Sequence, residues 1–128
     1  MLITQPVNII IEHLPIFEVL NPILEVDIKD AGDVTNGRSA AKCYRTRWDM
    51  HEVYPSFKKL SDAILEVVKR ACGLATDEEG LPKDYILRTH DSWGLIYKKG
   101  DITSAHQHYP CLWSWTYCVS SCELCSPL

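Results

Sequence analysis

An apolar stripe at helical spacing runs through residues 54–73, "YPSFKKLSDAILEVVKRACG", and constrains the fold more than any other feature. The stripe consists of Phe57, Leu60, Ile64, Val67, Val68 and Ala71. Apolar side chains that recur every three or four residues predict an amphipathic helix. Gly73 supplies its C-terminal stop, and Glu66 can pair with Arg70 one turn on. Such a helix must bury its stripe against other elements.

Segments on the N-terminal side of this helix predict a strand and a second helix. Residues 7–14, "VNIIIEHL", are rich in β-branched side chains and have the length of a typical strand. Residues 21–32, "NPILEVDIKDAG", carry a helix signature. In it Asn21 is the N-cap, Pro22 is the first helical residue and Gly32 is the stop.

The rest of the chain alternates between loops and short strand patterns. Residues 33–53 predict a loop that runs into irregular or strand-like chain, and residues 75–84 predict a solvated loop. Residues 85–101 contain short apolar runs broken by turn residues. Residues 112–119, "LWSWTYCV", alternate between two faces, as a strand does. A strand, helices and then antiparallel strands predict one α+β domain over residues 1–128.

Charge, hydropathy and cysteine content narrow the functional classes. The net charge of −4 gives no electrostatic attraction to nucleic acid or to an anionic membrane. The longest apolar run is far shorter than the roughly 20 residues that a membrane span needs. Nothing in the sequence directs export, so we expect a soluble cytoplasmic protein whose six cysteines are reduced.

A His-x-His motif at His106 and His108 is the strongest candidate for chemistry. Residues i and i+2 of a strand project to the same face, so both imidazoles can converge on one metal ion. Neutral imidazole suits zinc, iron, copper or nickel. Two histidines do not complete a stable site, and candidates for a third ligand are His51, His90 and Asp91. No spacing rule favours any of the three.

The histidine motif lies within a string that resembles a known family. Residues 92–119, "SWGLIYKKGDITSAHQHYPCLWSWTYCV", are similar to the iron-ligand region of the 2-oxoglutarate and Fe(II)-dependent oxygenases, in particular the short phage and bacterial members. Residues 42–60, "KCYRTRWDMHEVYPSFKKL", are similar to the segment that precedes the barrel in this group. The resemblance covers roughly residues 40–128 and lies in the string as a whole.

This resemblance implies a fold, a cofactor and a reaction. The N-terminal strand and helices would pack on a partial double-stranded β-helix, or jelly-roll, of antiparallel strands. His106 would be the first ligand of a catalytic Fe(II), and His108 stands where many relatives carry a carboxylate. Tyr97 stands where relatives place a tyrosine that hydrogen-bonds the cosubstrate, 2-oxoglutarate. Oxidative decarboxylation to succinate and carbon dioxide would drive oxidation of a substrate, which could be a small molecule, a peptide or a nucleobase.

The resemblance also implies that this chain is shorter than the family's full domain. The distal histidine and the arginine that grips 2-oxoglutarate come late in relatives and have no counterpart here. We therefore expect a truncated jelly-roll whose own activity is doubtful. Its open sheet edges and exposed apolar face would favour self-association.

The C-terminal cysteines support an alternative hypothesis for the function of the chain. Cys122 and Cys125 form a Cys-x-x-Cys motif and, with His106 and His108, make a set that tetrahedral zinc could accept. In this alternative the chain is a small zinc-binding module with a structural or interaction role and no catalysis. A phage or accessory protein without catalysis is a third possibility.

Overall fold

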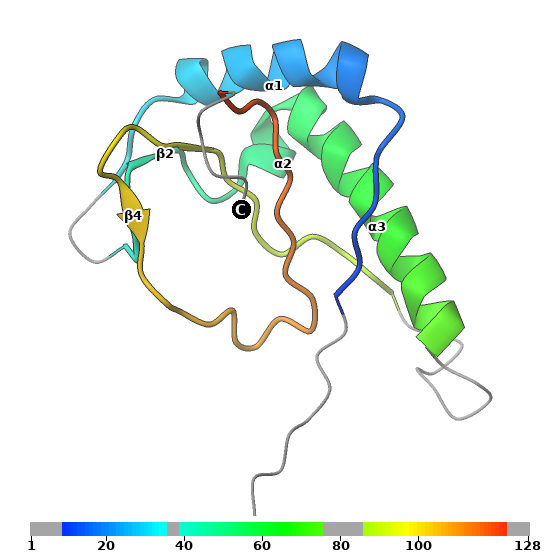
Figure 1. Cartoon of the computed structure of the whole chain (residues 1–128). Helices are drawn as coiled ribbons and strands as arrows, with labels where there is room; N and C mark the ends of the chain where they lie inside the picture. Colours follow the sequence, from blue (N-terminus) through cyan, green and yellow to red (C-terminus); the bar gives the residue numbers. More distant parts are fainter. Residues whose placement is uncertain (1–8, 36–38, 76–85, 123–128) are drawn as a thin grey trace, which may run out of the picture.

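The computed structural model describes residues 9–35, 39–75 and 86–122, and within them the chain is α+β (Figure 1). The described helices are α1 (Phe17–Ala31), α2 (Met50–Val53) and α3 (Pro55–Ala75). The described strands are β1 (Ala41–Lys42), β2 (Tyr44–Arg45), β3 (Leu95–Ile96) and β4 (Ile102–Thr103). None of the described helices is long and apolar enough to cross a membrane.

Helix α3 confirms the amphipathic helix that the apolar stripe predicts. It begins at Pro55, whose missing N–H is tolerated in a first turn, and Phe57 is 3% exposed. The helix continues past Gly73, because an isolated glycine weakens a helix by only about 1 kcal/mol. The predicted pairing of Glu66 with Arg70 is wrong. Glu66 binds Lys69 instead, while Arg70 reaches Glu12 at 2.5 Å.

Helix α1 begins five residues earlier than its cap signature predicts. It starts at Phe17, so Pro22 lies inside the helix and Asn21 is not its N-cap. The reason is packing, because Leu20, Leu24 and Ile28 recur every four residues and all three are buried. Burial of this apolar stripe outweighs the cost of an internal proline. Gly32, with φ at 77°, follows the helix as predicted.

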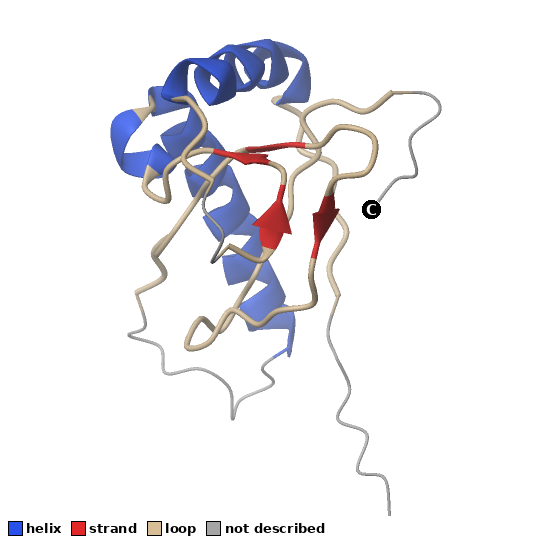
Figure 2. Ribbon diagram, turned by 90° about the vertical axis from the view of Figure 1, so that its left-hand side faces the viewer, coloured by secondary structure: helices blue, strands red, loops and turns tan. Residues whose placement is uncertain are grey.

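The hydrophobic core forms where α1 crosses the N-terminal half of α3, with α2 beside the crossing (Figure 1). Its buried members are Leu14, Leu20, Leu24, Ile28, Met50, Phe57 and Leu60. Leu24 and Met50 are completely shielded from solvent. The strands lie to one side of this helical layer, as Figure 2 shows.

Two antiparallel pairs make up the described sheets. β1 pairs with β4, and β2 pairs with β3 (Figure 2). Gly94, just before β3, exchanges hydrogen bonds with Thr46. The Thr46 N–H donates to the Gly94 carbonyl at 3.1 Å, and the Gly94 N–H donates to Thr46 Oγ1 at 2.9 Å. A Cβ on Gly94 would lie 2.5 Å from Cγ1 of Ile28, so glycine permits α1 to pack directly on this segment.

The predicted N-terminal strand is not formed in its described part, residues 9–14. Ile9 and Ile11 are 80% and 93% exposed, and no described strand pairs with this segment. An ion pair from Glu12 to Arg70 holds the segment beside α3 instead. β-Branched residues favour a strand only where a pairing edge is within reach, and here none is described. Residues 7 and 8 and most of the predicted loop at 75–84 lie outside the described residues.

Residues 112–119 show the predicted two-faced pattern in their burial. Half-buried side chains alternate with exposed ones, and the half-buried members are Trp113, Trp115, Tyr117 and Val119. The segment has no ladder partner among the described residues. Asn21 of α1 holds it instead, accepting the Tyr117 hydroxyl at 2.6 Å and donating to the Val119 carbonyl at 2.7 Å. Burial raises the pKa of Tyr117, which keeps the phenol protonated as a donor.

Replacing Asn21 by alanine should lower the free energy of unfolding by about 1–2 kcal/mol, because two part-buried hydrogen bonds are lost together. Tyr117→Phe should cost about half as much, because only the hydroxyl bond disappears. Urea denaturation followed by circular dichroism measures both values. Thr116→Ala, at an exposed neighbour, is the control. Equal stabilities for Asn21→Ala and this control would contradict the role of Asn21.

Candidate metal-binding site

The structure brings the two histidines of the His-x-His motif together. Their Nε2 atoms lie 3.1 Å apart, and the ring centroids are 4.7 Å apart at an angle of 75°. The pair lies in a loop after β4 rather than in a strand. His106 is exposed and His108 is half-buried, so the shared face of the two rings is open to solutes.

Hydrogen bonds assign the proton positions on this pair. Nδ1 of His106 lies 2.8 Å from the Ser104 carbonyl, which can only accept, so this nitrogen carries the proton. Nε2 of neutral His106 is then an acceptor, and His108 donates to it through its own Nε2–H. In a histidine that binds a metal through one ring nitrogen, the other ring nitrogen usually donates its N–H to a carbonyl or a carboxylate. His106 is therefore held in the tautomer that leaves Nε2 available.

A row of aromatic rings extends from the histidine pair to Trp48, which is exposed. The Trp93 ring lies 6.0 Å from that of His108 and is tilted 31° from it. Trp48 meets Trp93 edge-on at 4.5 Å, and the Arg45 guanidinium lies 4.2 Å over the Trp48 ring. The sequence does not predict that Arg45 and Trp48 lie near the histidines, because they are distant from them in the chain. Trp93 lies in the sequence "DSWG", but no feature of the sequence predicts that its ring lies beside His108.

The spacing of the two imidazole nitrogens fits one metal ion. Two nitrogens bound to one ion at about 2.0–2.1 Å, with an angle of roughly 90–110° between them, lie about 2.9–3.4 Å apart. The observed 3.1 Å falls inside this interval. Within residues 9–35, 39–75 and 86–122, no group of three potential ligands forms. The described residues thus offer two nitrogen ligands for a metal ion at this site, Nε2 of His106 and Nε2 of His108.

The three candidates for a third ligand do not join the histidine pair. Nδ1 of His51 lies 2.9 Å from the Ser92 hydroxyl, whose oxygen also accepts the His51 backbone N–H. His90 is exposed and lies 2.9 Å from Asp91. Ser92 is 1% exposed, and its backbone carbonyl accepts the first N–H of α2. Ser92 therefore satisfies the first two N–H groups of that helix, those of Met50 and His51.

Tyr97 directly follows β3. Its hydroxyl hydrogen-bonds Thr103 Oγ1. Among the described residues, no contact joins Tyr97 to either histidine.

Cys122 is disulfide-bonded, whereas the sequence analysis expects reduced cysteines. That expectation rested on the absence of an export signal, which carries no information about which sulfurs lie close together. Zinc binds thiolate sulfur, so Cys122 could ligate zinc only after this bond is reduced. Cys125, the other cysteine of the zinc alternative, lies outside the described residues.

The thiols of this chain should differ in reactivity. Cys43 is 7% exposed and burial raises its pKa, while Cys111 and Cys118 are exposed free thiols. Only the thiolate reacts, so at pH 8 we expect iodoacetamide to modify Cys43 at least about ten times more slowly than the exposed pair. Peptide mapping by mass spectrometry measures the rates. Urea should bring Cys43 to the rate of the others, and equal rates in the folded protein would contradict its burial.

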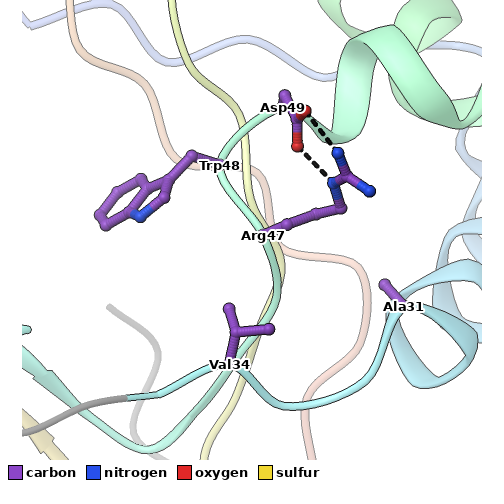
Figure 3. A pocket seen from close by; sticks show the side chains of 5 residues that line it. All are labelled: Ala31, Val34, Arg47, Trp48 and Asp49. Atoms are coloured by element: carbon purple, nitrogen blue, oxygen red, sulfur yellow. Dashed lines mark hydrogen bonds and ion pairs between the residues drawn. The ribbon is translucent and has the colours of Figure 1, made fainter.

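An open pocket lies at the outer end of the aromatic row (Figure 3). It is lined by Ala31, Val34, Arg47, Trp48 and Asp49. Arg47 holds Asp49 through two hydrogen bonds, one of them from Nη2 to Oδ2 at 2.6 Å. This contact lowers the pKa of Asp49 and raises that of Arg47, so both groups stay charged. Trp48 belongs both to the pocket and to the row that ends at His108.

Comparisons with known proteins found no match to this chain. No family model matches the chain, and neither a curated protein nor a solved structure matches it significantly. The function therefore has to be inferred from the geometry of the site and from the resemblance of residues 92–119.

Proposed function

We propose that this chain binds one divalent transition-metal ion through Nε2 of His106 and Nε2 of His108. The observation that carries the proposal is the 3.1 Å separation of these two nitrogens. The carbonyl of Ser104, which fixes the tautomer of His106, supports it further. Both imidazoles must be neutral to bind, and the proton on Nε2 of His108 must move to its Nδ1, so that this Nε2 can also act as a ligand. We therefore expect affinity to fall as the pH is lowered.

We propose further that the ion is Fe(II) and that it serves a 2-oxoglutarate-dependent oxygenase reaction. The support for this step is the resemblance of residues 92–119 to the iron-ligand region of those enzymes. Fe(II), when bound, would supply chelation of the keto acid and the reduction of oxygen. In this proposal the two antiparallel strand pairs belong to a partial jelly-roll.

The protein's own contribution in this proposal is positioning and shielding. The Ser104 carbonyl orients the His106 ring, and the Trp93 ring lies beside that of His108. The indole rings of Trp93 and Trp48 present an apolar surface that limits access of water from that side. Trp115, another aromatic of this region, packs against the helical core and takes no part.

Anaerobic titration with Fe(II) and 2-oxoglutarate tests this proposal. We expect a visible charge-transfer absorption that requires both additions and is absent from His106→Ala. His90→Ala, at an exposed histidine outside the pair, should keep the absorption. Fe(II) binding without that absorption would contradict the oxygenase reaction while leaving the metal site in place. Zinc that binds only after reduction and is lost on cysteine alkylation would favour the zinc module instead.

A further inference from the structure

The described histidine pair supplies only half of the ligands that a tetrahedral metal ion takes. Zn(II) that is held without catalysis is almost always bound by four side chains in a tetrahedron. Nε2 of His106 and Nε2 of His108 are two such ligands, and no group of three potential ligands forms within residues 9–35, 39–75 and 86–122. As far as the described residues go, two positions of the ion stay open to water or to another molecule.

The pair lies at the surface, where a second protein molecule can reach it. His106 is exposed and His108 is half-buried. Tyr109 and Leu112, which follow in the chain, are 87% and 83% exposed, so large apolar side chains next to the pair in sequence face solvent. In Figure 1 the chain that follows β4 runs along the edge of the molecule opposite α1, away from the hydrophobic core. Burial of these apolar side chains would favour association at this edge.

Hydrogen bonds hold the loop that carries the pair on both sides. The Ser104 N–H donates to the Ala40 carbonyl at 3.0 Å, next to the pairing of β1 with β4, and the Ser104 carbonyl accepts from Nδ1 of His106. On the other side, the Cys111 N–H donates to the His108 carbonyl at 2.7 Å. The two imidazoles are thus positioned before a metal binds, and ligands that are already ordered lose less conformational entropy on binding.

We propose that one tetrahedral ion, such as Zn(II), is shared by two copies of this chain, each of which contributes His106 and His108. A second copy fits the open positions, because it presents two imidazole nitrogens at the same 3.1 Å spacing, which suits adjacent positions on one ion. Two identical ligand pairs on one ion are related by a twofold axis, the commonest symmetry of protein dimers. The inference rests on the two-histidine metal site of the proposed function but not on the oxygenase reaction, because a shared four-coordinate ion has no open position for a cosubstrate.

The amount of metal should control this association. Each chain carries a net charge of −4, so two copies repel each other weakly until a divalent cation lies between them. With half an equivalent of metal, each ion has two chains to bind, whereas excess metal gives each chain an ion of its own. The dimer should therefore form and then dissociate again as metal is added.

Sedimentation velocity and native mass spectrometry of the full, untagged chain during titration with Zn(II) test this inference. The mass should rise from 14.6 kDa toward twice that value at half an equivalent of Zn(II), with one ion bound per two chains. Excess Zn(II) should return the chain to a monomer with one ion. Removal of the metal by EDTA should also restore the monomer, which excludes a disulfide between the exposed thiols of Cys111 or Cys118 as the cause of the dimer.

Substitutions show whether the pair itself joins the two copies. His106→Ala and His108→Ala should each stay monomeric at every Zn(II) ratio, and His106→Gln serves if the alanine variant does not fold. His90→Ala, at an exposed histidine outside the pair, should associate as the wild type does. Zn(II) held by a monomer at half an equivalent, a dimer with one ion per chain, or association that persists in the His106 and His108 variants would overturn the sharing of one ion. In the first of these cases the metal site of the proposed function stands, whereas a chain that binds no Zn(II) contradicts both proposals.

Discussion

His106→Ala should lower the affinity of the chain for Fe(II) or Co(II) by more than about 100-fold, since loss of a supporting group alone costs about 10–100-fold. The substitution removes one of the two described donors and leaves a single imidazole. His108→Ala should have a similar effect, because each nitrogen lies 3.1 Å from the other and both face the same space. Isothermal titration calorimetry under anaerobic conditions measures the affinities.

Two controls make this result specific. His90→Ala and His13→Ala remove exposed imidazoles outside the pair and should leave the affinity unchanged. The double variant lacking both His106 and His108 should bind no more weakly than either single variant, since either loss already destroys the two-point site. Unchanged affinity in His106→Ala would show that the metal, if bound at all, is held elsewhere.

Gly94→Ala should lower the free energy of unfolding by about 2–3 kcal/mol, the upper part of the range for inserting a methyl group into a packed site. The added Cβ would lie 2.5 Å from Cγ1 of Ile28 and 3.0 Å from its other two branch atoms. Ile28 is 7% exposed and β-branched, so its side chain cannot turn away freely. Urea denaturation gives the value.

A double-mutant cycle with Ile28 separates this clash from other effects of the substitution. Ile28→Ala removes all three atoms that the new methyl group would meet. In that background Gly94→Ala should cost less than about 1 kcal/mol, so the two substitutions should be strongly non-additive. Fully additive effects would mean that the methyl group is accommodated without contact to α1.

The sequence predicts an element correctly where the apolar residues of a single segment fall on one face. The stripe that includes Phe57 and Leu60 predicts α3 correctly, because burial of that stripe is what holds the helix in place. The alternation at residues 112–119 likewise appears in the burial of Trp115 and Tyr117. The alternation does not predict whether another strand pairs with this segment, because pairing depends on other parts of the chain.

Local signatures failed where contacts from distant segments decide the outcome. Asn21 and Pro22 look like a helix start, yet packing of Leu20 extends α1 to Phe17 and leaves Asn21 to hold residues 117–119. The β-branched run at residues 9–11 has no strand beside it in the described chain. In both cases the local pattern was correct as a propensity, but tertiary contacts outweighed it.

The site was predictable to the same limited extent. The i, i+2 spacing of His106 and His108 correctly suggested that their rings could meet, although they do so in a loop rather than in a strand. The position of Trp93 beside His108 follows from how the chain returns after β3 and has no local signal. The disulfide at Cys122 had no signal in the sequence either.

The most direct test of the metal site is an imidazole nitrogen spectrum of the ¹⁵N-labelled chain during titration with diamagnetic Zn(II). Before metal is added, His106 should show the Nδ1–H tautomer and His108 the Nε2–H tautomer. With one equivalent of Zn(II), the Nε2 signals of these two residues should shift together while the other three histidines stay unchanged. A shift of one ring alone, or of neither, would contradict a shared metal ion.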